Sequence, residues 1–335
     1  MEQTPRPPTS DPPEGEDTQP AEGIPWLDRH PWLHLILFTW CAVFLQAVGV
    51  AMFAGLLLST RVGAWEFERL AQNVDLMVEA LEDLGASDKL QIMAAGWGLP
   101  LLFVLYAWQW GLGRPRTSLG LIEGPRVAPA LLVGLGQAAL LLTLMVAAAA
   151  TLGVMTPLGG TFTAPELLAL APDLAFGSCL MLVVAFAEEV MVRGYVLQVI
   201  WQRLGAWPGL LLTTGWFTAM HISNPDVTAR GLMGVASAGL LLGLITLRDG
   251  HLWRAIGLHW GWNVGLGLVL GLPVSGQPGE GLLRWQRSPA ADFWMGGAFG
   301  PEEGLLAILV MGLMALWTWA RLEEPRLPSP EVAPE

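Results

Sequence analysis

The sequence predicts an all-α fold, namely a polytopic membrane helix bundle of about eight transmembrane helices with one amphipathic helix outside the membrane. Of the 335 residues, 53% are hydrophobic and only 14% are charged, and the mean hydropathy is +0.50. This balance differs from that of ordinary soluble domains. Long apolar runs recur along the chain, and a backbone in lipid must satisfy its own hydrogen bonds, so runs of about 20 residues are expected to be helices. A β-barrel would need shorter segments of alternating polarity.

The charge and cysteine content exclude two classes of protein. The chain has 29 acidic and 17 basic residues, for a formal net charge of -12. No basic stripe is available to neutralise phosphates, which argues against binding of nucleic acid. The two cysteines, Cys41 and Cys179, both lie in apolar runs. A disulfide framework or a thiolate metal site is therefore not expected.

Composition divides the chain into five parts. Residues 1–25 contain seven prolines and six acidic residues, a composition that cannot bury enough apolar surface to fold, so we expect a disordered tail. This tail lacks the pattern of a signal peptide, so the first apolar run is interpreted as a retained span. The other parts are N-terminal transmembrane helices (26–174), a membrane core that carries three polar motifs (175–272), a loop with the final transmembrane helix (273–321) and a second disordered tail (322–335).

Eight apolar runs are candidates for transmembrane helices: 31–58, 92–112, 127–154, 175–201, 207–223, 230–247, 252–272 and 304–321. The three runs between 207 and 272 give the weakest signal because they are short and closely spaced. If the N-terminus is cytoplasmic, alternate loops place ten basic residues on the cytoplasmic side and six on the other. The positive-inside rule therefore favours two cytoplasmic termini.

An amphipathic helix is predicted over residues 65–90, between the first two spans. Its apolar residues recur mostly at steps of three and four, with acidic residues among them: Trp65, Phe67, Leu70, Val74, Met77, Leu81 and Leu84. We interpret it as a surface helix that packs on the spans or lies flat on the interface. Its acidic face argues against strong attraction to anionic lipid.

Three charged residues interrupt the fourth apolar run. Glu188, Glu189 and Arg193 stand where each charge costs about 2.5 to 3.5 kcal/mol on insertion scales. Glu189 and Arg193 are four residues apart and share a helix face, so an internal ion pair is expected between them. Glu188 projects about 100° away and is free for another partner. The alternative to a functional role is that all three residues form a buried ion cluster that only fixes helix packing.

Two later runs add imidazole and amide groups. The fifth contains Phe217 and His221, and the seventh contains His259 and Asn263, which are four residues apart and share a face. A single intramembrane His or Asn is most often a packing or interhelical hydrogen-bonding residue. Together with Glu188 and Glu189, however, these residues supply an acid–base carboxylate, imidazoles that can hold water or metal, and a donor for an oxyanion.

These motifs resemble, in order and spacing, the signature of the CAAX prenyl endopeptidase and bacteriocin-processing family of intramembrane proteases, the type II CAAX protease family. The matching positions are Glu188-Glu189-x-x-x-Arg193, Phe217-x-x-x-His221 and His259-x-x-x-Asn263, and the likeness extends over about 175–272. Each motif alone is weak evidence, whereas all three in order make chance similarity improbable.

The resemblance implies a role for each residue. Glu188 would be the general base that activates a water, with His221 helping to hold that water, and His259 with Asn263 would stabilise the oxyanion. Glu189 and Arg193 match structural or substrate-orienting positions, and Phe217 matches an aromatic packing position. Because hydrolysis requires water, we expect a polar cavity between the fourth, fifth and seventh spans, open to one aqueous face.

Expectations for the cofactor, the partners and the location of the protein accompany this resemblance. A mechanism without a cofactor is favoured, because the carboxylate, imidazole and amide groups fill the base and oxyanion roles. A zinc site of Glu188, His221 and His259 is the alternative, although the chain lacks a His-Glu-x-x-His helix. The expected partners are the lipid bilayer and a membrane-embedded or lipid-anchored peptide or protein substrate. The expected location is the bacterial inner (plasma) membrane.

Two other functions use the same polar residues. The first is a non-catalytic immunity or scaffold protein that binds a peptide through the cluster. The second is a transporter whose Glu and His residues relay protons, an interpretation weakened because no repeat relates the two halves of the chain. Loss of reporter cleavage in Glu188→Ala would favour the protease over the binder, and proton-coupled uptake into proteoliposomes would favour the transporter.

Overall fold

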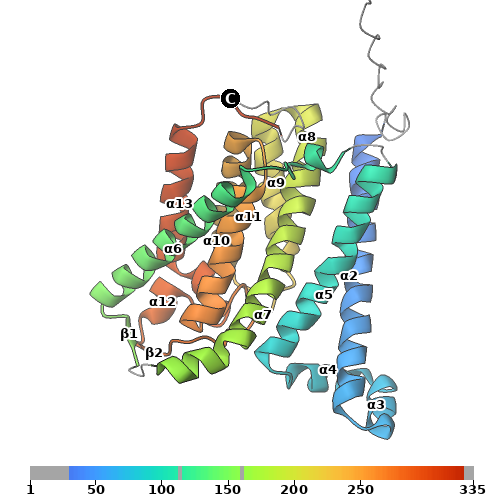
Figure 1. Ribbon diagram of the computed structural model, residues 1–335, viewed down its shortest axis with the longest axis vertical. Coiled ribbons are helices and arrows are strands. Elements are labelled where there is room, and N and C mark those ends of the chain that lie inside the picture. Colours follow the sequence, from blue (N-terminus) through green and yellow to red (C-terminus); the bar gives the residue numbers. More distant parts are fainter. Residues whose placement is uncertain (1–29, 112–114, 159–161, 328–335) are drawn as a thin grey trace, which may run out of the picture.

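A computed structural model of the chain describes residues 30–111, 115–158 and 162–327. Within these ranges the chain is mostly helical, with two strands of three residues each (Figure 1). The all-α prediction is confirmed. The predicted tail 1–25 lies outside the described residues. Of the predicted tail 322–335, only residues 322–327 are described, and these contain no helix or strand.

All eight predicted spans correspond to helices. They are α2 (Pro31–Arg61), α5 (Ala86–Tyr106) continued by the π-helical η1 (Ala107–Gly111), α6 (Val127–Thr151), α7 (Ala164–Glu189) continued by the π-helical η3 (Val190–Val196) and by α8 (Leu197–Leu204), α9 (Ala206–Met220), α10 (Ala229–Asp249), α11 (Trp253–Val264) continued by the π-helical η4 (Gly265–Leu270), and α13 (Leu305–Ala320). Among the described residues, five helical segments are long and apolar enough to cross a membrane: 35–61, 86–109, 127–151, 164–204 and 229–249. The protein is therefore an integral membrane protein.

The prediction of one amphipathic helix over 65–90 is wrong. Two short helices, α3 (Ala64–Ala71) and α4 (Val74–Glu82), occupy most of this range, and α5 already begins at Ala86. The break has a local cause, because the side chain of Asn73 accepts hydrogen bonds from the backbone N–H groups of Asp75 and Leu76 and thereby starts a new helix. Apolar spacing continues across this break, so periodicity alone did not reveal it.

Glycines allow the closest helix crossing of the bundle. α6 lies across α11 (Figure 1), and a Cβ at Gly134 of α6 would overlap the carbonyl oxygen of Arg254. A Cβ at Gly257 of α11 would likewise overlap the carbonyl oxygen of Leu131. Close backbone approach of this kind is typical of membrane helices that pack through small residues. It holds α11, which carries His259 and Asn263, firmly against α6.

The segment between η4 and α13 folds back onto the bundle. Its strand β2 (Trp285–Arg287) pairs antiparallel with β1 (Met155–Pro157), and α12 (Ala291–Met295) and the 3-10 helix η5 (Pro301–Glu303) follow. η5 lies directly against α10, where a Cβ at Gly234 would overlap the carbonyl oxygen of Glu302. Two adjacent carboxyl groups, Glu302 and Glu303, are thereby carried into the protein, each with 4% of its surface exposed.

Candidate active site

The carboxylate of Glu189 joins two helical segments. Its Oε1 accepts a hydrogen bond from Nη1 of Arg193 at 2.8 Å and is 2.9 Å from Nδ1 of His259 on α11. Glu189 and Arg193 are both fully buried, and the predicted ion pair between them is confirmed. Its contact with His259 gives Glu189 a position next to the candidate catalytic groups.

Arg193 is held from three sides. Besides Glu189, it donates through Nη2 to the carbonyl oxygen of Gly239 at 3.1 Å, and its guanidinium carbon lies 4.3 Å from the ring centroid of Phe217. A Cβ at Gly239 would lie 3.2 Å from the Phe217 ring, so glycine lets α10 approach this group closely. Phe217 thus packs on the cation, which agrees with a supporting role. Arg193 belongs to η3, and π-helical turns are frequent at functional sites.

Glu188 and His259 face each other without a direct hydrogen bond. Oε2 of Glu188 lies 3.8 Å from Nε2 of His259, which is too long for a hydrogen bond but short enough for one bridging water. Oε2 of Glu188 is buried and has no hydrogen-bond partner among the described residues. An ionised carboxylate only accepts hydrogen bonds, so the contact with Glu189 places a proton on Nδ1 of His259 and turns Nε2 toward Glu188.

His221 stands at the end of α9 with its ring orientation fixed. Its Nδ1 lies 2.8 Å from the carbonyl oxygen of Phe217, and because a carbonyl only accepts, Nδ1 is the protonated nitrogen. Nε2 of His221 is therefore free to accept a hydrogen bond from water. The Phe217 ring centroid lies 4.7 Å from the His221 ring and 6.2 Å from the His259 ring, so Phe217 contacts both imidazoles.

A small cavity, called the inner cavity below, lies beside both imidazoles. It has a volume of about 40 Å³, and its polar lining is His221, His259, Trp262, Asn263, Ser275 and Glu302. This volume is enough for a water molecule. The cavity was expected between the fourth, fifth and seventh spans, but its lining comes from α6, α9, α10, α11, α13 and the segment between η4 and α13, and not from α7. The fourth span, α7, instead lines a second cavity that shares Asn263 with the inner cavity.

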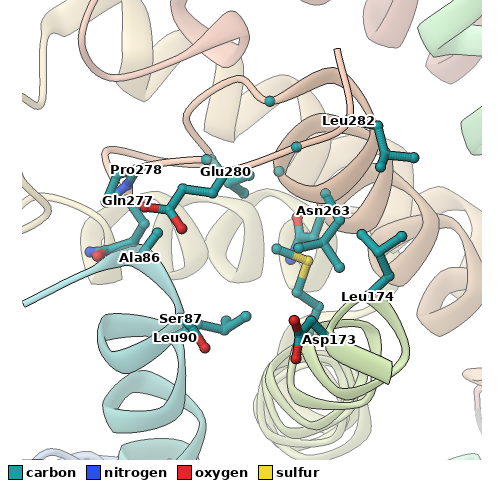
Figure 2. A pocket seen from close by; sticks show the side chains of 18 of the residues that line it. Ala86, Ser87, Leu90, Asp173, Leu174, Asn263, Gln277, Pro278, Glu280 and Leu282 are labelled. Atoms are coloured by element: carbon teal, nitrogen blue, oxygen red, sulfur yellow. The ribbon is translucent and has the colours of Figure 1, made fainter. Parts of the chain in front are cut away.

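A larger cavity, the outer groove, meets the inner cavity at Asn263. It has a volume of about 850 Å³ and lies between the start of α5, one face of α7 and the loop 271–284. Figure 2 shows Asn263 between Leu174 of α7 and the loop that carries Glu280. Asn263 lines both cavities. Its amide group therefore lies where a molecule in the outer groove would meet the two histidines.

The face of α7 that lines the outer groove leads to Glu188. Leu170, Leu174, Gly177, Met181 and Val184 all line the groove and follow one another at steps of three or four residues. Glu188 comes four residues after Val184, so it continues the same helical stripe. Oε2 of Glu188 faces His259, which lines the inner cavity, so this stripe leads from the outer groove toward His259.

Glu302 was missed by the sequence analysis. Its carboxylate accepts hydrogen bonds from the backbone N–H of Ser275 at 3.2 Å and from the Ser275 hydroxyl at 3.1 Å. Burial raises the pKa of Glu302 to about 7, because loss of hydration disfavours the charged form. The available signal was a pair of adjacent carboxylates beside Gly304, immediately before the last apolar run. By composition alone this pair belongs to the loop that precedes the final span.

The candidate zinc ligands do not form a metal-binding group. Across the ranges that the structure describes, no cluster of three or more His, Cys, Asp or Glu residues is arranged to hold a metal ion. The Nδ1 atoms of His259 and His221 contact protein acceptors, and Oε2 of Glu188 lies 3.8 Å from Nε2 of His259.

Comparison with family models identifies the core of the bundle. Residues 170–265 match the model described as Type II CAAX prenyl endopeptidase Rce1-like. This segment is an Rce1-like domain. It contains all three motifs, from Glu188 to Asn263, so the resemblance drawn from the sequence is confirmed. No curated protein and no solved structure matched the chain.

The Rce1-like domain relates the protein to membrane endopeptidases and implies a protein or peptide substrate at the lipid bilayer. Its boundaries enclose α7 almost from its start, then α9, α10 and α11. Ser275 and Glu302 lie outside it. The inner cavity is therefore lined partly by the Rce1-like domain, partly by the segment that follows it and, at Leu141, by α6, which precedes it.

Proposed function

We propose that the protein is an intramembrane endopeptidase that hydrolyses a peptide bond of a membrane-associated protein or peptide. The observation that carries this proposal is the separation of 3.8 Å between Oε2 of Glu188 and Nε2 of His259. One water fits this separation, and it would lie at the end of the outer groove, where a peptide could present its carbonyl group.

In the proposed reaction Glu188 is the general base. It removes a proton from the bound water, while Nε2 of His221 accepts the second hydrogen bond of that water and orients it. The oxygen then attacks the carbonyl carbon of the scissile amide, and the carbonyl oxygen becomes an oxyanion. Oriented donors at that position contribute more than any other single effect in many hydrolases.

Asn263 and His259 are the proposed oxyanion donors. The amide nitrogen of Asn263 can donate in any protonation state of the site. Nε2 of His259 can donate only in the imidazolium form, because Nδ1 already carries the proton shared with Glu189. The neighbouring carboxylates Glu188 and Glu189 stabilise that positively charged form through their own negative charge.

The outer groove is the proposed substrate site. Its volume of about 850 Å³ is within the range of binding pockets for small ligands or for a short peptide segment. Apolar residues of α7 form one wall, and Lys89, Asp173, Glu280 and Arg284 contribute charges of both signs. This lining suits an extended segment with mixed side chains near a C-terminus or next to a membrane anchor.

We further propose a metal-free, glutamate-type reaction, with both termini on the cytoplasmic side of a bacterial plasma membrane. The metal-free reaction is supported because Glu188, the two histidines and Asn263 can fill the base and oxyanion roles by themselves. The cytoplasmic position of the termini is supported by the distribution of basic residues in the loops. Cleavage is expected to survive dialysis against a zinc chelator. Loss of cleavage that added zinc restores would instead identify a metal-dependent enzyme.

The decisive experiment compares membrane proteomes of cells that carry the wild-type chain or Glu188→Gln. Mass spectrometry is expected to find new C-termini or released peptides only with the wild type. Glu79→Gln is the control, because Glu79 is an exposed carboxylate of α4 outside both cavities. If Glu188→Gln leaves the biological activity intact, the chain acts as a non-catalytic peptide-binding protein.

A further inference from the structure

Glu302 brings a third buried carboxyl group to the proposed active site, in addition to Glu188 and Glu189. It lines the inner cavity together with His221, His259 and Asn263, although it comes from η5, outside the Rce1-like domain. The cavity measures only about 40 Å³. Groups that share so small a space can be connected by a single water.

The position of Glu302 is strictly fixed. Its backbone rests on Gly234, where any side chain would overlap the Glu302 carbonyl. Its carboxylate accepts a hydrogen bond from the backbone N–H of Ser275. The φ angle of Ser275 is 48°, and a positive φ is uncommon for residues other than glycine. The carbonyl oxygen of Ser275 accepts a hydrogen bond of 2.8 Å from Asn224. Glu302 is thus tied to the loop that directly follows His221.

Trp262 places a buried donor next to Glu302 at the wall of the inner cavity. Trp262 is 4% exposed and lines the inner cavity. Its indole Nε1 is buried without a direct hydrogen-bond partner among the described residues, yet it lies close enough to stabilise the charge on Glu302. A buried donor usually has a partner. A water in the cavity can accept from Trp262 and donate to Glu302.

We propose that Glu302 is a second acid–base residue of the active site, which supplies through the water of the inner cavity the proton that the leaving amine takes up. This inference rests on the proposed peptidase function and adds a residue to it. The near-neutral pKa of Glu302 fits the role, because both its protonated and its ionised forms are then populated.

The protons balance as follows. Glu188 takes one proton from the attacking water, and the remaining hydroxyl forms the new C–O bond. When the C–N bond breaks, its electron pair goes to nitrogen, which takes a proton from the inner-cavity water, and Glu302 restores that proton. The products are a carboxylic acid and an amine. A proton then passes from Glu188 to Glu302 through water as the products leave.

The test compares two substrates with the same acyl group, one a peptide amide and the other an ester whose leaving group departs without a proton. In purified protein in liposomes, Glu302→Gln should lower kcat for the amide about 100-fold and change kcat for the ester less than about threefold. Glu303→Gln is the matched control, because Glu303 is equally buried but binds Gly297 and Thr228 and does not line the cavity. It should affect both substrates equally.

The outcomes separate this inference from the proposed function. If the wild type cleaves the amide and Glu188→Gln does not, while Glu302→Gln slows amide and ester alike, then Glu302 is only structural and the inference is overturned. If Glu188→Gln cleaves as fast as the wild type, the proposed function itself fails. Should Glu302→Gln not fold, Glu302→Asp decides: it keeps an acid and should slow the amide more than the ester, whereas equal slowing overturns the inference.

Discussion

Nδ1 of His259 lies 2.9 Å from Oε1 of Glu189, and the same oxygen binds Arg193 at 2.8 Å. One buried carboxylate therefore both neutralises a buried cation and orients a candidate catalytic imidazole. Sequence spacing identified the first of these contacts. The second joins residues 70 positions apart and depends on how α7 and α11 pack.

Replacing Glu189 and Arg193 separately or together should give different stabilities. Glu189→Leu leaves a buried cation without its partner and is expected to cost about 3–5 kcal/mol. The double variant Glu189→Leu/Arg193→Leu removes both charges and should be more stable than either single variant. Thermal unfolding in detergent measures this. All three variants should lose cleavage activity. The variants without Glu189 no longer orient His259, and the variants without Arg193 lose the cation next to Phe217. A double variant less stable than both single variants would contradict the account.

Asn263→Ala tests the oxyanion role. If the amide donates to the developing oxyanion, its removal should lower kcat by about 10²–10³ with little change in KM. Steady-state kinetics on a cleaved peptide measure both parameters. A rise in KM at unchanged kcat would instead show that Asn263 contributes to substrate binding alone, which its position in the outer groove also permits.

Two glycines of α6 form a matched pair for the helix crossing. Gly134→Ala would force a methyl group into the backbone of α11 at Arg254, and overpacking of this kind typically costs about 1–3 kcal/mol. Gly136→Ala meets open space and should be neutral or stabilising, because alanine favours helices. The two melting temperatures in detergent check this. Equal effects would show that the crossing of α6 and α11 is looser than described.

Glu302 should make the stability depend on pH. Its pKa is raised from 4.5 to about 7 in the folded protein, so the folded state binds this proton more tightly than the unfolded state. Stability is therefore expected to fall as the pH rises from about 4.5 to about 7, by an amount on the order of 3 kcal/mol. Melting curves of the wild type should show this loss, and those of Glu302→Gln should lack it. The same slope in both proteins would contradict the buried position of Glu302.

The sequence predicted the helices of the bundle well, because a local run of about 20 apolar residues is enough to mark a membrane-spanning helix. The helix breaks between 65 and 90 were missed, since they depend on the capping side chain of Asn73 and on the start of α5 at Ala86. Periodicity is insensitive to both. The range of the family resemblance was also predicted closely, because three spaced motifs mark it.

The site was predicted less completely than the fold. The approach of Glu188 to His259 could be inferred from motifs on neighbouring spans. The inner cavity could not, because Ser275 and Glu302 reach it only through the return of the segment after η4 against Gly234. Contacts made by such a loop leave no periodic signal in the sequence.

Cleavage by purified protein in liposomes, with wild type and Glu188→Gln compared on a peptide found in the proteome experiment, tests the central claim most directly. That claim is that the carboxylate of Glu188, 3.8 Å from His259, activates the hydrolytic water. Removal of a general base in this position should reduce kcat by about 10²–10⁴, with the melting temperature little changed. A Glu188→Gln protein that folds and cleaves within about threefold of the wild-type rate would contradict it.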